Sequence, residues 1–217
     1  MGEVRMSVRS RRRRDARGAV AVEAALVTPI LMIFVFGIIE MSLLMRDHVA
    51  LSSAVRVGGR TASANAGSGP GGVDESGGCT SPCTPGNAPK LAQLAANAIQ
   101  RAGSALPPDT INELWVYKAN NQGYPGASGN TTWVCSTNCV RYTWVKSTDS
   151  FRYLSGTWGS TTINACANNN PDSVGIYMKA THSFISGLFG SGVSIQDHSV
   201  FAFEPLPTVT CGAGQHP

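Results

Sequence analysis

Apolar residues follow one another almost without interruption from Gly18 to Met45. Sixteen uncharged residues separate Glu23 from Glu40, and the apolar character resumes after Glu40. A helix needs about 20 mostly apolar residues to cross the hydrocarbon core of a bilayer. We therefore predict a membrane-spanning helix over residues 19–45, with the two glutamates near its ends. A buried core helix is the alternative, but a soluble domain of this size rarely contains one so long.

The helical pattern continues beyond the predicted span. Small apolar residues recur at helical spacing as far as Val57. Gly58 and Gly59 form a weak point, because each glycine costs about 1 kcal/mol relative to alanine. A helix over residues 19–65 would measure about 70 Å, and its apolar stripe would need the head domain or neighbouring copies as a partner. The pattern leaves open whether residues 46–65 form one helix with the span.

The rest of the chain predicts a small head domain. Residues 66–89 are rich in Gly, Ser and Pro and indicate a linker. A short helix follows, with Pro89 near its start and Gly103 at its end. β-Branched and aromatic residues then predict strands at 111–119, 131–135 and 140–146, and two longer strands after Pro171. A helix followed by an antiparallel sheet gives an α+β head over residues 90–217.

The last two predicted strands form a hairpin centred near Phe189. Apolar side chains occupy even positions from Val174 to Phe184 and odd positions from Val193 to Phe203. An antiparallel pairing in which residue numbers sum to about 377 places both rows on one side of the sheet. A slip of one residue would break this pattern, whereas a slip of two would not.

Charge is concentrated at the N-terminus. Residues 1–17 contain seven arginines and two acids, a net of +5, and the remaining 200 residues carry ten basic and eleven acidic groups. A nucleic-acid-binding protein would need its positive field on the folded body, so we expect no nucleic-acid partner. By the positive-inside rule, residues 1–18 form a cytoplasmic leader and the head lies outside the cell. A cleaved secretory signal is the competing interpretation, but the apolar run is too long.

The residues around the span also carry a family resemblance. Its parts are the R-G pair at 17–18, the A-V-E core, the T-P step, the F-G-I-I-E stretch and the alanine-rich tail. As a set, residues 17–63 resemble the N-terminal module of the TadE-like family, the minor pilins of the tight-adherence (Flp) pilus system. The resemblance implies a pilin-like fold and a single-pass membrane protein, with other pilins and pilus-assembly membrane proteins as partners.

The resemblance further implies processing by a prepilin peptidase. Cleavage after Gly18 would make Ala19 the first residue and Glu23 the fifth, which is the prepilin spacing. Major pilins of this system usually place a tyrosine after the glutamate, whereas Ala24 stands here. A carboxylate inside hydrocarbon needs a partner, so Glu23 would pair with the freed amine of a neighbouring subunit and set its register. An interfacial glutamate without a special role is the alternative. We expect Glu40 to be a solvated or headgroup-level acid, with a contact to a partner as the alternative.

Six cysteines follow the span, and on the outward side of a membrane they indicate disulfides. The pairs that the spacing favours are Cys79–Cys83, Cys135–Cys139 and Cys166–Cys211. The last of these lies across the open base of the predicted hairpin, and the second flanks a tight turn. A zinc site made by the two C-x3-C pairs is the rival, but no histidine lies near either of them in the sequence.

No sequence motif indicates catalysis. No G-x-S-x-G, H-E-x-x-H or P-loop string occurs, so we predict no enzyme, cofactor or metal site. His182 and Asp197 fall nearly opposite each other in the predicted hairpin and should form a structural hydrogen-bonded pair. The aromatic residues should form sheet core and cross-strand pairs, with a ligand-binding face as the alternative; they are Trp115, Tyr117, Trp133, Tyr142, Trp144, Tyr153 and Trp158.

Together these features predict a non-catalytic minor pilin or pilus-assembly subunit that acts through helix packing. The alternative is a static membrane-anchored binding or adhesion protein that never enters a filament. The state of the N-terminus separates the two: a chain that begins at Ala19 supports the first, and an intact end at Met1 supports the second.

Overall fold

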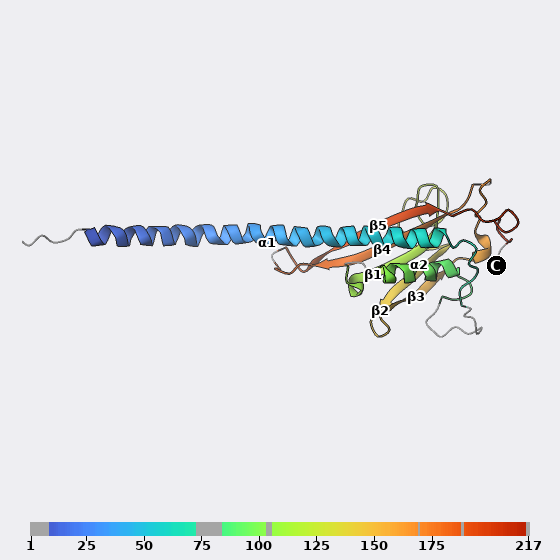
Figure 1. Cartoon of the computed structure of the whole chain (residues 1–217), viewed down its shortest axis with the longest axis horizontal. Coiled ribbons are helices and arrows are strands. Elements are labelled where there is room, and N and C mark those ends of the chain that lie inside the picture. The colour runs from blue at the N-terminus through green and yellow to red at the C-terminus, as the bar shows by residue number, and fades with distance from the viewer. Residues whose placement is uncertain (1–8, 73–83, 103–105, 169, 188, 216–217) are drawn as a thin grey trace, which may run out of the picture.

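The computed structural model describes residues 9–72, 84–102, 106–168, 170–187 and 189–215. A single rod-like helix, α1 (Arg9–Ser63), projects far beyond a small head (Figure 1). The helix contains 55 residues and runs without a break through Gly58 and Gly59. It therefore begins ten residues before the predicted start and ends two residues before the predicted end. Residues 46–63 belong to the same helix as the apolar run.

The head is an antiparallel sheet with α1 and a short helix on one face. The strand order is β3-β2-β1-β4-β5. The strands are β1 (Ile111–Ala119), β2 (Cys139–Val145), β3 (Ser150–Thr157), β4 (Ser173–Ser183) and β5 (Gly192–Ala202). The short helix is α2 (Lys90–Arg101), and two 3-10 turns occur at Pro108–Thr110 and Ser160–Thr162. The predicted α+β architecture, a long apolar helix followed by an antiparallel sheet with one short helix, is confirmed.

The C-terminal half of α1 forms part of the core of the head. It packs against α2, β4 and β5, as Figure 1 shows. Leu51 and Val55 are fully buried, and Leu91 and Ile99 of α2 meet them in the same cluster. Burying apolar surface contributes about 25 cal/mol per Å², so this contact anchors the head to the helix.

The Gly58-Gly59 pair explains how closely these elements approach one another. A Cβ atom at Gly58 would lie 2.7 Å from Cδ1 of Ile99, and one at Gly59 would lie 2.4 Å from Cδ2 of Phe201. Both distances are shorter than any normal carbon contact. Glycine at these two positions therefore admits α2 on one side of α1 and β5 on the other, which offsets the loss in helix propensity.

Two sequence predictions about strands are wrong. Residues 131–135 form no strand and lie in the loop between β1 and β2. There the amide of Asn130 donates to the carbonyl of Pro125 at 2.6 Å, and its carbonyl oxygen accepts from the hydroxyl of Thr132. β3 was not predicted, because its residues alternate poorly between apolar and polar; it pairs with β2 after a turn in which Asp149 has a φ of 47°.

The hairpin of β4 and β5 has a register two residues away from the predicted one. Ala180 faces Ile195, whereas the predicted pairing would place Asp197 opposite Ala180. The turn is centred one residue earlier, where Gly187 adopts a φ of 69°, which glycine tolerates without strain. A shift of two residues keeps the alternation of the pleat, so Ala180 and Ile195 are still both buried.

Two disulfides close the head. Cys135 is bonded to Cys139, with Cα atoms 5.4 Å apart, and Cys166 to Cys211, with Cα atoms 4.7 Å apart. The favoured pair Cys79–Cys83 lies outside the described residues.

The described ends of the Gly/Ser/Pro segment are bonded to each other. The amide of Gly71 donates to the carbonyl of Ala88 at 2.7 Å, and that of Lys90 donates to the carbonyl of Gly69 at 2.9 Å. These bonds bring the end of α1 next to the start of α2.

Candidate membrane and assembly helix

The N-terminal part of α1 presents apolar side chains to its surroundings on every side. Leu26, Phe34 and Ile38 are each 68% exposed, and the most apolar 18-residue window of the helix has no buried residue. A core helix of a soluble protein would be mostly buried, so this alternative is not what the structure shows. Residues 19–39 extend about 31 Å at 1.5 Å per residue, which matches a hydrocarbon core of about 30 Å.

The residues predicted for cleavage and assembly lie at the N-terminal end of this surface. Gly18, Ala19 and Glu23 are all exposed on α1. Among the side chains that the structure describes, none forms a hydrogen bond or ion pair with Glu23.

Glu40 lies at the C-terminal end of the exposed apolar surface, and the prediction that it is solvated is wrong, whereas its level relative to a membrane stays a prediction. Its side chain is only 2% exposed because the turn between β4 and β5 covers it. The backbone amide of Ser186 donates to Oε1 of Glu40 at 2.6 Å. The head therefore reaches down the helix to this level, and the exposed run ends at Ile39, six residues before the predicted limit of the span.

A second buried contact lies two helical turns further along α1. Nδ1 of His182 and Oδ2 of Asp47 are 2.7 Å apart, and the residues are 4% and 7% exposed. The predicted partner of His182, Asp197, is wrong: Asp197 faces Met178 and accepts a hydrogen bond from the backbone amide of His198. The two-residue change in register separates the predicted pair, and α1 supplies a carboxylate instead.

The contacts of Glu40 and Asp47 fix the hairpin of β4 and β5 along the helix. Both carboxylates lie on the face of α1 that the hairpin covers, seven residues apart, which is two turns of an α-helix. The sequence did not predict either contact, because two acids seven residues apart occur equally well on a helix face that is exposed to solvent. The signal that could have revealed the role of Asp47 is the single histidine on the apolar row of β4, which needs a buried polar partner; no comparable signal exists for Glu40.

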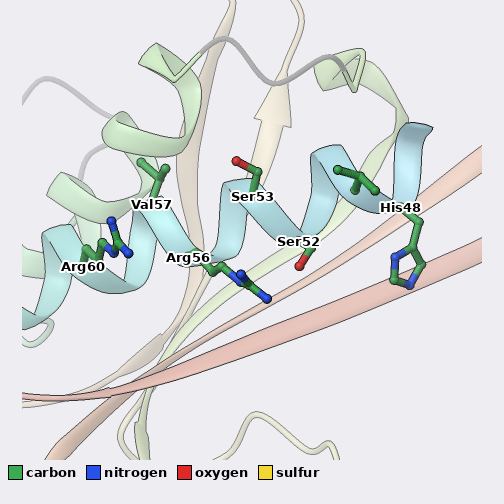
Figure 2. Close-up of a pocket in the computed structure, with 7 residues that line it drawn as sticks. His48, Ser52, Ser53, Arg56, Val57 and Arg60 are labelled. Carbon is green, nitrogen blue, oxygen red and sulfur yellow. The ribbon is translucent and has the colours of Figure 1, made fainter. Parts of the chain in front are cut away.

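The opposite side of α1 in the head region is open. A groove there is lined by polar and basic residues of the helix together with Val49 and Val57, and Figure 2 shows His48, Ser52 and Arg56 along one side of it. None of the described lining residues is an acid or a cysteine. The described lining of the groove therefore lacks the paired acid and base that general acid–base catalysis requires.

The aromatic residues form packed clusters. Trp133 from the β1–β2 loop stacks on Tyr177 with ring centroids 4.9 Å apart and contacts Tyr124 at 4.7 Å. Trp115 and Tyr117 beneath it are 7% and 0% exposed. These rings cover the face of the sheet away from α1, as the interpretation as core and cross-strand pairs expects. Among the described residues, no group of three His, Cys, Asp or Glu side chains could hold a metal ion.

Residues 18–60 match the family model described as TadE-like protein. This segment of the chain is TadE-like. The match confirms the resemblance that the sequence around the span indicates. No curated protein and no solved structure matches the chain.

The TadE-like segment coincides with most of α1. It contains the whole exposed apolar surface and also the buried residues Glu40, Asp47 and Leu51, with which α1 meets the head. The TadE-like segment thus has two parts of different character: an N-terminal half that is exposed on all sides and a C-terminal half that is built into a folded domain.

Proposed function

We propose that this chain is a non-catalytic TadE-like minor pilin, or pilus-assembly subunit, of a tight-adherence type IV pilus. The observation that carries the proposal is the exposed apolar length of α1, residues 19–39, inside the TadE-like segment. A surface of this kind has no water-soluble role, because it leaves large aliphatic and aromatic side chains uncovered on every side of the helix. It is stable only in lipid or packed among similar helices.

The proposed arrangement places residues 1–18 in the cytoplasm as a basic leader. Residues 19–65 hold the span and its extension, residues 66–89 form the linker, and residues 90–217 form the extracellular head. The seven arginines before Gly18 favour this orientation. The disulfides of the head agree with it, since such bonds persist in oxidising compartments.

Assembly then acts through α1. A prepilin peptidase cuts between Gly18 and Ala19, and the new amine pairs with Glu23 of a neighbouring subunit. Inside the bilayer an unpaired carboxylate is unfavourable, so the pairing selects one axial offset between neighbours. The exposed carboxylate of Glu23 supports this role.

Mass spectrometry of the protein recovered from membranes and from sheared filaments tests the proposal. A chain that begins at Ala19 and occurs in both fractions is the expected result. A chain that keeps residues 1–18 and never leaves the membrane fraction contradicts it and supports the static anchor.

A matched pair of variants tests the register contact. Glu23→Gln should keep the membrane level of the protein and lose its recovery in filaments, because the amide cannot pair with an ammonium group. Glu204→Gln, which changes an exposed acid of the head, should leave both fractions unchanged. Equal filament recovery of the two variants would remove Glu23 from assembly.

A further inference from the structure

The turn between β4 and β5 is an apolar projection without charge. No Asp, Glu, Lys or Arg occurs between Ala180 and Gln196. At the tip, Ile185 is 78% exposed and Phe189 is 52% exposed. Large apolar side chains this exposed on an uncharged loop mark a surface that another apolar phase covers.

The tip lies directly against α1. The ring of Phe189 is 3.6 Å from the position that a Cβ atom of Gly37 would occupy, and the amide of Ser186 is bonded to Glu40. In Figure 1 the hairpin runs along α1 and its turn points toward the N-terminal half of the helix. The exposed apolar surface of α1 therefore continues onto the tip at the level of Gly37.

The height of the tip follows from the helix rise. Residues 19–37 extend about 27 Å along the axis, compared with a hydrocarbon core of about 30 Å. With the inner end of the span at Ala19, Gly37 lies at the outer boundary of the acyl chains. Ile185 and Phe189 lie at the same boundary, because the contacts with Gly37 and Glu40 fix the hairpin along the helix.

We propose that the β4–β5 tip is a second membrane-binding element, which inserts Ile185 and Phe189 among the lipid headgroups and outer acyl chains beside the span. The inference rests on the proposed membrane span and adds the head as a lipid-contacting part. Apolar faces of interfacial elements enter this boundary by about 5–10 Å, and phenylalanine is a residue that such faces use.

Lipid is the occupant that the geometry favours. The tip is continuous with a helix surface that has the length of a bilayer core, and it is at the outer end of that length. Glu40 supports the assignment: its carboxylate, at the same level, is covered by the tip and hydrogen-bonded by Ser186. The hairpin thus shields an acid from the acyl chains while presenting its own apolar side chains outward.

Tryptophan variants of the full-length protein in phosphatidylcholine vesicles test the inference. Emission is compared between vesicles with ordinary and with brominated acyl chains, which quench only indoles that touch lipid. Ile185→Trp is the test variant. Val209→Trp is the matched control, because Val209 is also 78% exposed and belongs to the C-terminal segment at the far end of the head (Figure 1). Val27→Trp reports on the span.

Brominated lipid should reduce the added emission of Ile185→Trp and Val27→Trp but not that of Val209→Trp. Phe189→Trp should show the same loss of emission, and it keeps the test valid if Ile185→Trp folds poorly. Quenching of Val27→Trp alone would overturn the inference and leave the span intact. A blue-shifted but unquenched Ile185→Trp would also overturn it, because the tip would then pack on protein, such as a second copy. No quenching at Val27 would reject the proposed span itself.

Discussion

Replacing Gly59 with alanine places a methyl group at the point where α1 crosses β5. The new Cβ would lie 2.4 Å from Cδ2 and 2.5 Å from Cε2 of Phe201. Carbon atoms in contact stay about 3.5–4.0 Å apart, so the ring has to withdraw by about 1 Å. The strand cannot follow easily, because the hydroxyl of Ser199 donates to the carbonyl of Val55 at 2.7 Å and holds β5 against the helix.

Two effects of opposite sign compete in this variant. Alanine stabilises a helix by about 1 kcal/mol relative to glycine, whereas overpacking a filled contact costs about 1–3 kcal/mol. We expect Gly59→Ala to lower the unfolding free energy of the head by up to about 2 kcal/mol. When Phe201 is also replaced by alanine the ring is gone, and the same change at Gly59 should then stabilise the head by about 1 kcal/mol.

Urea unfolding of the full-length chain in detergent micelles, followed by tryptophan fluorescence, measures all four members of this cycle. The expected coupling between the two positions is about 1–3 kcal/mol. A Gly59→Ala variant that is more stable than the parent chain, or that changes stability equally in both backgrounds, would refute the close approach of helix and strand.

Three further outcomes follow from the head. Removing the Cys166–Cys211 disulfide by double alanine replacement should lower the unfolding free energy by about 4 kcal/mol, because it closes a 45-residue separation; an unchanged urea midpoint would contradict this. Alanine at Asp47 should cost about 1–3 kcal/mol, because it removes the partner of the buried Nδ1 of His182; alanine at His182 should cost less, because Asp47 keeps its ion pair with Arg46, and the double variant should cost less than the sum. Burial raises the pKa of Tyr142 above its ordinary value of 10, so the folded chain keeps a proton that the unfolded chain loses. The free energy of unfolding should therefore fall above about pH 10. Absorbance titration of the phenols checks the raised pKa.

The order of long helix, short helix and sheet could be predicted from the sequence, because these elements carry a local period or a composition that favours strands. The apolar run up to Ile39 and the alternation in β4 and β5 are such signals. β1 was predicted at the observed bounds, Ile111–Ala119, for the same reason: its β-branched and aromatic residues fit a strand buried on both faces.

The features that the sequence did not predict depend on contacts between distant segments. Residues 131–135 have a high strand propensity but form a loop, because Trp133 packs on Tyr177 and Cys135 is bonded to Cys139. The register of β4 and β5 depends on the turn at Gly187, since alternation alone accepts any even shift. No local pattern could indicate that an acid beside the span would lie under that turn.

The burial of Glu40 has the same origin. Its carboxylate meets the amide of Ser186, which is 146 residues further along the chain. From the sequence alone, an acid at the end of an apolar run is most simply placed in water or among headgroups. Glu40 is buried instead, because the β4–β5 hairpin extends along α1 as far as this residue.

Because α1 is continuous, a tilt of its N-terminal part also moves the head. Membrane helices tilt by about 20° on average. Residues 40–63 extend about 35 Å beyond the proposed span, so such a tilt would swing the C-terminal end of the helix sideways by about 12 Å. The head is packed onto this arm, and the helix contains no break at which the swing could be absorbed. In the proposed membrane arrangement, a small change in the angle of α1 would therefore become a large lateral movement of the head.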